Sequence, residues 1–428
     1  MKNTNFYIKG LSYSNYFFLA LFIFSFYFAN PSLSEIVYLY KAPLFSDFYD
    51  LLNNYLGGKT HLDTYNPRTF YLIFSIIPES LLPSYFDRSS IIQNYKEYYE
   101  EYIFSNLYFY IIFMVVSLSL FFHSFYLHIR RYINNLSVEM KITILLAIIF
   151  SYPMFYGFLR GNNIILAVAF LNYFLFFRQK PFISSIFGIL AISIKIYFAP
   201  LIIFFIIKNL KFSYIFGFFF LLAIYFTFNQ YDIVSLFDSN LLYEKAISYW
   251  KNYSHIERYN YNISFDTFFH FIKFTTKNFL GEEVSSILFT HVTLLIWRFV
   301  LIFYILFRIN KIFKFFKEEN DYILISILYF IFLIVFSPFT PMYFLIPLVV
   351  FFFILIESYE FNKYIITLMI IACSFKRFLV YPYPYSRYDF LSLDGAITSV
   401  TLILIFIYLI EKIICGNLIK KVDHSIGK

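Results

Sequence analysis

Charged residues are scarce in this chain. Asp, Glu, Lys and Arg make up 14% of its 428 residues, whereas apolar residues make up 60%. A water-soluble globular chain contains about 25% charged and about 45–50% apolar residues. A chain with so little charge cannot cover itself with a water-facing surface, which excludes the soluble two- or three-domain organisation that its length would suggest. We predict an integral membrane protein.

Cysteine is rarer still, and the common motifs of metal and nucleotide sites are missing. The two cysteines, Cys373 and Cys415, lie in apolar segments, which excludes a disulfide framework and a cysteine metal site. The histidines do not have the HExxH spacing of a zinc site, and no Walker motif occurs. The sequence therefore predicts no cofactor and assigns no residue to a metal.

The net charge of +8 raises the question of a nucleic-acid partner. The chain also has 64 Phe and 42 Tyr but only 2 Trp, and residues with A/T-rich codons dominate. We interpret this aromatic content as genome composition and not as a surface on which bases stack. The basic residues follow the loop bias of a membrane protein. The predicted partner is therefore the lipid bilayer, and no nucleic acid is expected.

Apolar runs recur along the whole chain. A bilayer core of about 30 Å takes about 20 residues per helix, and on this basis we expect about eleven or twelve spans. The expected spans are residues 16–34, 104–127, 142–158, 163–177, 182–194, 197–207, 212–229, 286–306, 321–336, 342–356, 364–380 and 396–414. Residues 182–207 are expected to form either one long helix or a hairpin broken around Lys195 and Pro200. We thus predict an all-α polytopic membrane protein that forms a single domain over residues 1–428.

Basic clusters predict the orientation of these spans. Short loops rich in Lys and Arg stay in the cytoplasm. The clusters at 130–131, 178–180, 208–211 and 308–317 all fall on one side of the predicted membrane. This pattern predicts a multi-pass protein of a bacterial inner membrane with both termini in the cytoplasm. The first span has no small-residue cleavage site and is expected to remain uncleaved. The long loops 35–103 and 230–285 then lie on the outer face.

The first outer loop contains a candidate catalytic carboxylate. The apolar residues of 48–56 have the spacing of an amphipathic helix, for which Ser46 or Asp47 is a suitable N-cap. Such a helix is expected to lie along the membrane surface with Asp47 at its start. Asp47 is either a general base or merely a cap, and both interpretations stay open at this point.

Three places carry positive charge where a lipid phosphate could be held. Lys195 lies in an apolar stretch, and an ionisable residue there is a functional candidate. Arg160 lies in a tight outer turn between two predicted helices. Lys376 and Arg377 lie near the outer end of the predicted helix 364–380. Anchoring at the membrane interface is the alternative for each of these cations.

The second outer loop is rich in aromatic and amide side chains. Such a loop suits a carbohydrate, because aromatic faces stack on sugar rings and amides bond hydroxyl groups. His255 and Asn262 are the candidate substrate-binding residues in this loop.

Several short segments occur in an order that is found in one known family. They are Ser46-Asp47-Phe48, Gly58-Lys59, Thr64-Tyr65-Asn66-Pro67, Arg160-Gly161-Asn162, Gly188 to Lys195 with Pro200, and Asn262-Ile263-Ser264. This series resembles glycosyltransferase family 87, the mannosyl- and arabinofuranosyl-transferase-like proteins of the GT-C superfamily that use polyprenyl-phosphate sugars. The turn departs from the family pattern, with Gly-Asn where many members have Gly-Gln.

The resemblance implies a GT-C-type bundle and the transfer of a monosaccharide from a polyprenyl-phosphate donor to an envelope glycan or glycolipid acceptor. It implies inversion at the anomeric carbon with an outer-loop carboxylate as base, by position Asp47 with Asp50 in reserve. Asp47 and Asp50 are close together in the sequence, which leaves metal dependence open. The implied donor-phosphate ligands are Arg160, Lys195, Lys376 and Arg377. The residues assigned to substrate binding are Tyr65, Asn162, His255 and Asn262.

Two other functions stay open. An O-antigen-type polymerase of oligosaccharide repeats would also have about twelve spans and large outer loops. A flippase for lipid-linked sugars, or another transporter, would line a central path with charged residues, whereas only Lys195 and Arg298 are well embedded here. No internal repeat of the kind found in many transporters occurs.

Overall fold

The computed structural model describes residues 2–27, 46–57, 74, 77–85, 102–132, 137–209, 217, 219, 223, 265–288, 291–318, 321–336, 342–374, 380–381, 391–416 and 418–419. Helices dominate throughout these ranges. The strands found there are β1 (Val380–Tyr381) and β2 (Leu391–Ser392), which pair antiparallel with Val380 opposite Ser392. The chain is therefore an all-α membrane protein, which confirms the predicted class.

Two helices of the described ranges are long and apolar enough to cross a membrane. They are α6 (Leu107–Tyr132) and α21 (Leu393–Ile414), and a third span results if α7 (Val138–Ile149) and α8 (Tyr152–Arg160) count as one bent span. Six further apolar helices are shorter. The total of about eleven or twelve spans stays a prediction.

The chain divides into two compact units. One comprises residues 1–38, 132–153 and 251–428, and the other comprises residues 39–131 and 154–250. The first unit contains α1 (Lys2–Tyr27), α7, α15 (Phe265–Leu280), α16 (Glu282–Leu288), α17 (His291–Glu318), α18 (Tyr322–Phe336), the 3₁₀ turn η6 (Met342–Leu345), α19 (Ile346–Ser358), α20 (Lys363–Cys373), both strands and α21. The second unit contains α3 (Ser46–Leu56), the 3₁₀ turn η2 (Glu79–Leu81), α6 up to Arg131, α8 from Met154 on, α9 (Ile164–Phe176), α10 (Pro181–Ile194), the 3₁₀ turn η4 (Ile196–Phe198) and α11 (Ala199–Asn209).

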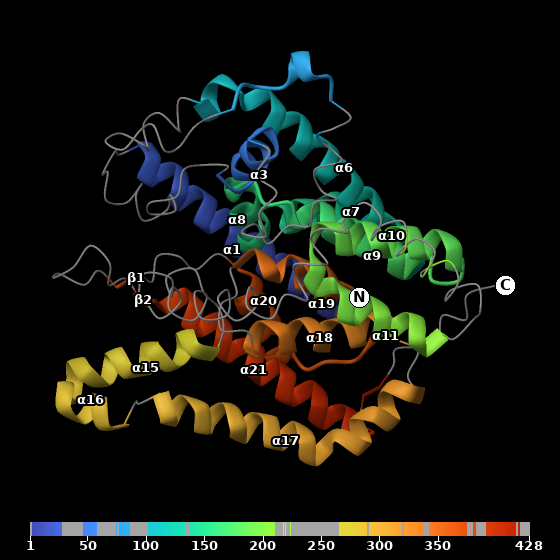
Figure 1. Ribbon diagram of the computed structural model, residues 1–428. Coiled ribbons are helices and arrows are strands. Elements are labelled where there is room, and N and C mark those ends of the chain that lie inside the picture. Colours follow the sequence, from blue (N-terminus) through green and yellow to red (C-terminus); the bar gives the residue numbers. More distant parts are fainter. Residues whose placement is uncertain are drawn as a thin grey trace. The chain divides into compact units, whose positions relative to one another are not determined.

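The core of the first unit is formed by α18 and α19. Both helices are apolar on all sides, and such a helix must be covered by other helices or by lipid. In α19 every residue from Ile346 to Ile356 is buried. Helix α1 packs on α7, α19 and α20 (Figure 1), and its Asn15 Nδ2 donates to the Ala147 carbonyl at 2.8 Å. The Tyr7 hydroxyl donates to the Val349 carbonyl at 3.5 Å.

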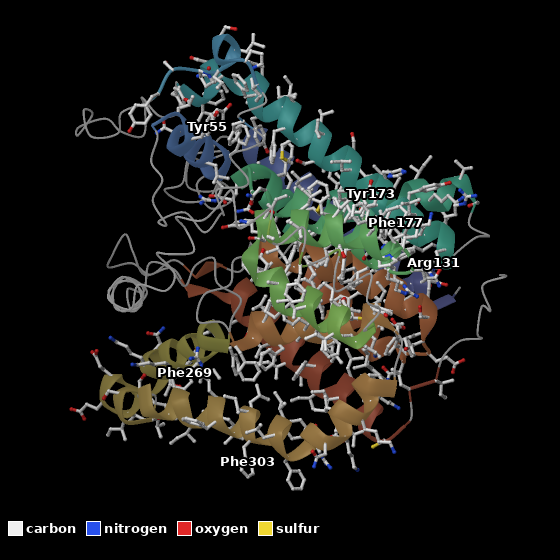
Figure 2. The ribbon with its side chains drawn as sticks, turned by 45° about the vertical axis from the view of Figure 1, so that its right-hand side comes forward. Tyr55, Arg131, Tyr173, Phe177, Phe269 and Phe303 are labelled. Atoms are coloured by element: carbon white, nitrogen blue, oxygen red, sulfur yellow. The ribbon has the colours of Figure 1, made fainter. Side chains whose placement is uncertain are left out.

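The core of the second unit is α9. Its residues are almost all buried, and α10 packs along it. The rings of Tyr173 and Phe187 stack with centroids 4.7 Å apart, and Ser184 Oγ donates to the Phe174 carbonyl at 2.9 Å. At the last residue of α9, the Arg131 guanidinium of α6 lies over the Phe176 ring, 5.8 Å from its centroid. Tyr173 and Phe177, one turn apart on this segment, are labelled in Figure 2.

Three predicted helix boundaries are corrected. The predicted span 142–158 is broken between α7 and α8, because Pro153 has no N–H to bond the Ile149 carbonyl. Residues 16–27 of the predicted span 16–34 belong to α1, which already begins at Lys2, and the rest of that span lies outside the described residues. The predicted helix 364–380 ends at Cys373, and Val380 belongs to β1. Of the two alternatives for residues 182–207, the break at Lys195 is confirmed, because Lys195 is extended (φ −139°, ψ 101°) and η4 follows it.

Gly188 marks a close approach between the helices of the second unit. A Cβ added there would lie 3.1 Å from the Phe174 ring and 3.2 Å from Ile202 Cγ2. Small residues let helices of membrane proteins approach closely. Gly188 is therefore a packing position of the α9–α10–α11 group.

We expect Gly188→Val to lower the free energy of unfolding by about 1–3 kcal/mol, because a branched side chain must displace both neighbours. Thermal unfolding of the purified protein in detergent measures this effect. Gly217→Ala is the control, since a Cβ there would approach no atom of the described residues closer than 3.7 Å and its effect should stay within about 0.5 kcal/mol. A Gly188→Val protein as stable as the control would contradict the packing role.

Candidate active site

An ion-paired carboxylate lies in the first turn of α3. Asp47 Oδ1 accepts a hydrogen bond from Arg160 Nη2 at 2.5 Å, and Oδ2 accepts one from Asn162 Nδ2 at 2.7 Å. Charge-assisted bonds of this kind are short and strong. The Asp47 side chain is 18% exposed and that of Arg160 is 23% exposed. The carboxylate is thus held at both oxygens and still reaches the surface.

The predicted amphipathic helix carries this carboxylate. Phe48 and Leu52 are buried, and the Phe48 ring stacks on Phe113 with centroids 4.9 Å apart. Phe48 also meets the Tyr110 ring edge-on at 5.8 Å and the Phe74 ring at 5.9 Å. The apolar face of α3 therefore packs against α6 and Phe74, which orients Asp47 at the start of the helix.

Two tyrosines connect the elements that carry the site. The Tyr49 hydroxyl donates to the Asn106 carbonyl at 2.6 Å, and the Tyr110 hydroxyl donates to the Phe158 carbonyl. Burial raises the pKa of Tyr49 well above its usual value, and nearby Tyr102 raises it further. Tyr49 therefore stays protonated and keeps donating at neutral pH. Sequence reasoning missed both roles, because no local pattern distinguishes these two among 42 tyrosines.

The turn between α8 and α9 places Arg160 and Asn162. Gly161 has φ +68°, its N–H bonds the Phe158 carbonyl at 3.0 Å, and the Asn162 N–H bonds the Gly157 carbonyl at 2.9 Å. This is the Schellman pattern of a helix end, in which the left-handed position favours glycine. Arg160 is the last residue of α8, where the helix dipole favours a cation.

Asn162 has two separate hydrogen bonds. Its Oδ1 accepts from the Ile164 N–H at 3.0 Å, while its Nδ2 donates to Asp47. The first bond satisfies a donor at the start of α9, and the second fixes one oxygen of the carboxylate. Asn162 therefore connects the start of α9 to the carboxylate on α3.

Lys195 lies between α10 and η4 and is 5% exposed. Its N–H bonds the Ala191 carbonyl at 2.9 Å and ends α10. Burial disfavours its charged form, and an electrostatic interaction with Asp47 opposes that effect in part. Burying an ammonium is costly unless an anion is near. The prediction that Lys195 occupies a break in the apolar stretch is confirmed, and a carboxylate stabilises its charge.

The structure brings together four of the predicted site residues, namely Asp47, Arg160, Asn162 and Lys195. They come from three segments of the second unit, namely the start of α3, the turn between α8 and α9, and the end of α10. Asp50 lies in α3, but its side chain is outside the described part of the structure. Five further predicted site residues also lie outside the described residues: Tyr65, His255, Asn262, Lys376 and Arg377.

Within the described ranges, no group of three or more His, Cys, Asp or Glu side chains could hold a metal ion. What these ranges do combine is the Asp47 carboxylate, the Arg160 guanidinium that bonds it and the buried Lys195 that interacts with it. This combination can accept a proton on the carboxylate and stabilise negative charge on a bound group.

An all-α membrane protein with a carboxylate held by an arginine and an asparagine, and interacting with a buried lysine, is the class that the fold and the site define. The family model of glycosyltransferase family 87 matches residues 103–338, which is more than half of the chain. The chain belongs to this family and is a glycosyltransferase. No curated protein and no solved structure matches it. Arg160, Asn162 and Lys195 fall inside the matched region, whereas Asp47 precedes it.

Proposed function

We propose that this glycosyltransferase moves a monosaccharide from a polyprenyl-phosphate donor to an envelope glycan or glycolipid acceptor. The observation that carries the proposal is the carboxylate of Asp47 held by Arg160 and Asn162, with the buried charge of Lys195 nearby. A donor anchored in the membrane by its lipid suits an all-α membrane protein with scarce charge. Its phosphate is an anion that the cations of the site can bind.

Asp47 is proposed as the general base. A carboxylate oxygen has two lone-pair directions, so each oxygen that already accepts one bond can accept another from the acceptor hydroxyl. Asp47 takes the proton of the acceptor hydroxyl. The oxygen of that hydroxyl attacks the anomeric carbon from the face opposite the phosphate. The new glycosidic bond forms, the bond between the anomeric carbon and the phosphate oxygen breaks, and the configuration inverts. Asp50 stays the reserve candidate for this role.

Polyprenyl phosphate is the leaving group, and negative charge grows on it as the bond breaks. Fixed cations lower the barrier of such a step because they stabilise the charge that develops. Lys195 is the proposed main contributor. The proposed further ligands of the phosphate are Arg160, Lys376 and Arg377. The proposed contacts to the sugar and the acceptor are Tyr65, Asn162, His255 and Asn262.

The proposal includes a location for the reaction. Residues 1–428 would act as one domain in a bacterial inner membrane, with the loops 35–103 and 230–285 on the outer face and both termini in the cytoplasm. The positive-inside pattern supports this orientation. A flippase no longer fits, because family 87 is a family of glycosyltransferases.

A donor assay tests the proposal. Purified protein in vesicles is given a panel of polyprenyl-phosphate monosaccharides together with membrane glycan extract, and the release of polyprenyl phosphate is measured. We expect one sugar to be consumed and a glycosylated acceptor to appear. Consumption of a nucleotide sugar in place of every lipid-linked sugar would overturn the donor. Consumption of a lipid-diphosphate oligosaccharide alone would favour a repeat polymerase.

A further inference from the structure

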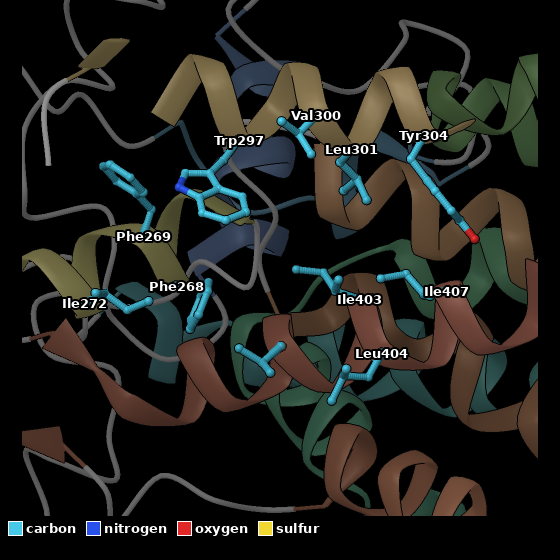
Figure 3. A pocket seen from close by; sticks show the side chains of 11 residues that line it. Phe268, Phe269, Ile272, Trp297, Val300, Leu301, Tyr304, Ile403, Leu404 and Ile407 are labelled. Carbon is cyan, nitrogen blue, oxygen red and sulfur yellow. The ribbon is translucent and has the colours of Figure 1, made fainter. Parts of the chain in front are cut away.

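An apolar groove of about 680 Å³ opens in the first unit between α15, α17 and α21 (Figure 3). Trp297 and Val300 on α17 and Leu404 on α21 line it, and they are 56%, 54% and 47% exposed. A groove with such exposed walls on a membrane protein is open to the lipids of the surrounding bilayer. Asp47, Arg160 and Lys195 belong to the other unit.

The groove has a polar end, which follows from helical spacing along α17. Trp297, Val300 and Tyr304 face the groove, and Arg308 and Lys311 follow Tyr304 at four and seven residues on the same face. The apolar wall therefore continues directly into two cations. Lys311 is exposed.

The length of the groove matches one leaflet. From Trp297 to Arg308 the helix rises about 16 Å at 1.5 Å per residue. Half of a hydrocarbon core of about 30 Å is about 15 Å. The facing helix α21 is one of those able to cross a membrane, and Glu411 lies near its end at Ile414. The cations are thus expected at a membrane–water boundary.

Arg308 is only loosely paired. Its Nη2 lies 3.8 Å from Glu411 Oε1, and that carboxylate also accepts a hydrogen bond from the Tyr304 hydroxyl. The Nε–H of Arg308 is buried and has no hydrogen-bond partner among the described residues. A guanidinium has five donors in a planar fork that suits a phosphate. With Lys311, the end of the groove carries more positive than negative charge.

We propose that this groove binds an anionic phospholipid, with an acyl chain along α17 and α21 and the phosphate at Arg308 and Lys311. Apolar walls suit the chain, and charge complementarity selects the headgroup. The orientation predicted from the basic clusters assigns Arg308 to the cytoplasmic side, whereas the proposed reaction takes place on the outer face. The occupant is therefore a structural lipid of the inner leaflet and not the sugar donor.

Native mass spectrometry of the purified full-length protein tests this proposal without measuring transfer. Phosphatidylglycerol and phosphatidylcholine with identical chains are titrated separately. We expect phosphatidylglycerol to bind about fivefold more tightly, which is the effect on an anionic lipid of the one net positive charge that Arg308, Lys311 and Glu411 leave together. Arg308→Gln should abolish this preference, and Arg308→Lys should keep most of it. Leu404→Trp, which fills the groove, should weaken the binding of both lipids.

Phe303→Trp is the matched control for Leu404→Trp, because Phe303 is 71% exposed on α17 and does not line the groove. It should leave both affinities unchanged. Lys311→Gln is a second headgroup variant, at an exposed position, and it should reduce the preference for phosphatidylglycerol. It keeps the test available if Arg308→Gln fails to fold. Equal binding of the two lipids by the wild type would overturn the proposal. The proposal would also be overturned if polyprenyl phosphate bound more tightly than phosphatidylglycerol and Leu404→Trp removed that binding. Dimers in place of lipid adducts would overturn it as well.

Discussion

Asp47→Asn is expected to lower kcat at least about hundredfold, the usual contribution of a positioned general base. The amide has nearly the shape of the carboxylate, but it is neutral and cannot accept the proton of the acceptor hydroxyl. Loss of the negative charge also weakens the bond from Arg160, which is 2.5 Å long in the wild type. The measurement is single-turnover transfer from the donor identified in the panel assay.

The matched control is Asp321→Asn. Asp321 Oδ1 accepts from the N–H groups of Ile323 and Leu324 at the start of α18, where Asn caps a helix about as well as Asp. Asp321→Asn should keep wild-type turnover and stability.

Asn162→Ala should lower kcat about tenfold without removing the base, since the substitution frees one carboxylate oxygen of Asp47. Asp47→Asn with turnover within tenfold of wild type would remove Asp47 from this role, and Asp50→Asn would then be the variant to measure.

Lys195→Met is the second variant with a large expected effect, a fall of about 10²–10³-fold in kcat. Removing one group that stabilises a developing anion has a cost of this size. Lys195 is 5% exposed, and in the variant Asp47 keeps its bonds to Arg160 and Asn162. Removing the buried charge therefore leaves no unpaired charge, and the thermal stability of Lys195→Met should equal or exceed that of the wild type. A purely structural lysine would give the opposite result, with stability lost and turnover per folded molecule retained.

Kinetics separates the proposed role from ground-state binding. Negative charge on the leaving phosphate grows toward the transition state, so kcat should fall much more than the donor KM rises. Lys195→Arg should recover part of the rate, because it keeps the charge. Lys180→Gln removes an exposed cation before α10 and should have no effect. If Lys195→Met changes only KM, Lys195 binds the donor without stabilising the transition state.

The candidate site was only partly predictable, and the reason differs among its residues. The helix of Asp47 follows from a local apolar spacing, and the break at Lys195 follows from a charge in an apolar run. Arg160 was assigned to a donor phosphate, whereas the structure bonds its Nη2 to Asp47. A pairing between residues 113 positions apart leaves no local pattern in either segment.

The sequence by itself determined the class of this protein. Scarce charge and recurring apolar runs require a bilayer, and the order of short motifs identified glycosyltransferase family 87, because both signals are local along the chain. Only the tertiary structure decided which groups meet Asp47. That choice depends on Phe48 packing against α6 and on the left-handed Gly161 ending α8, and both are consequences of packing between distant segments.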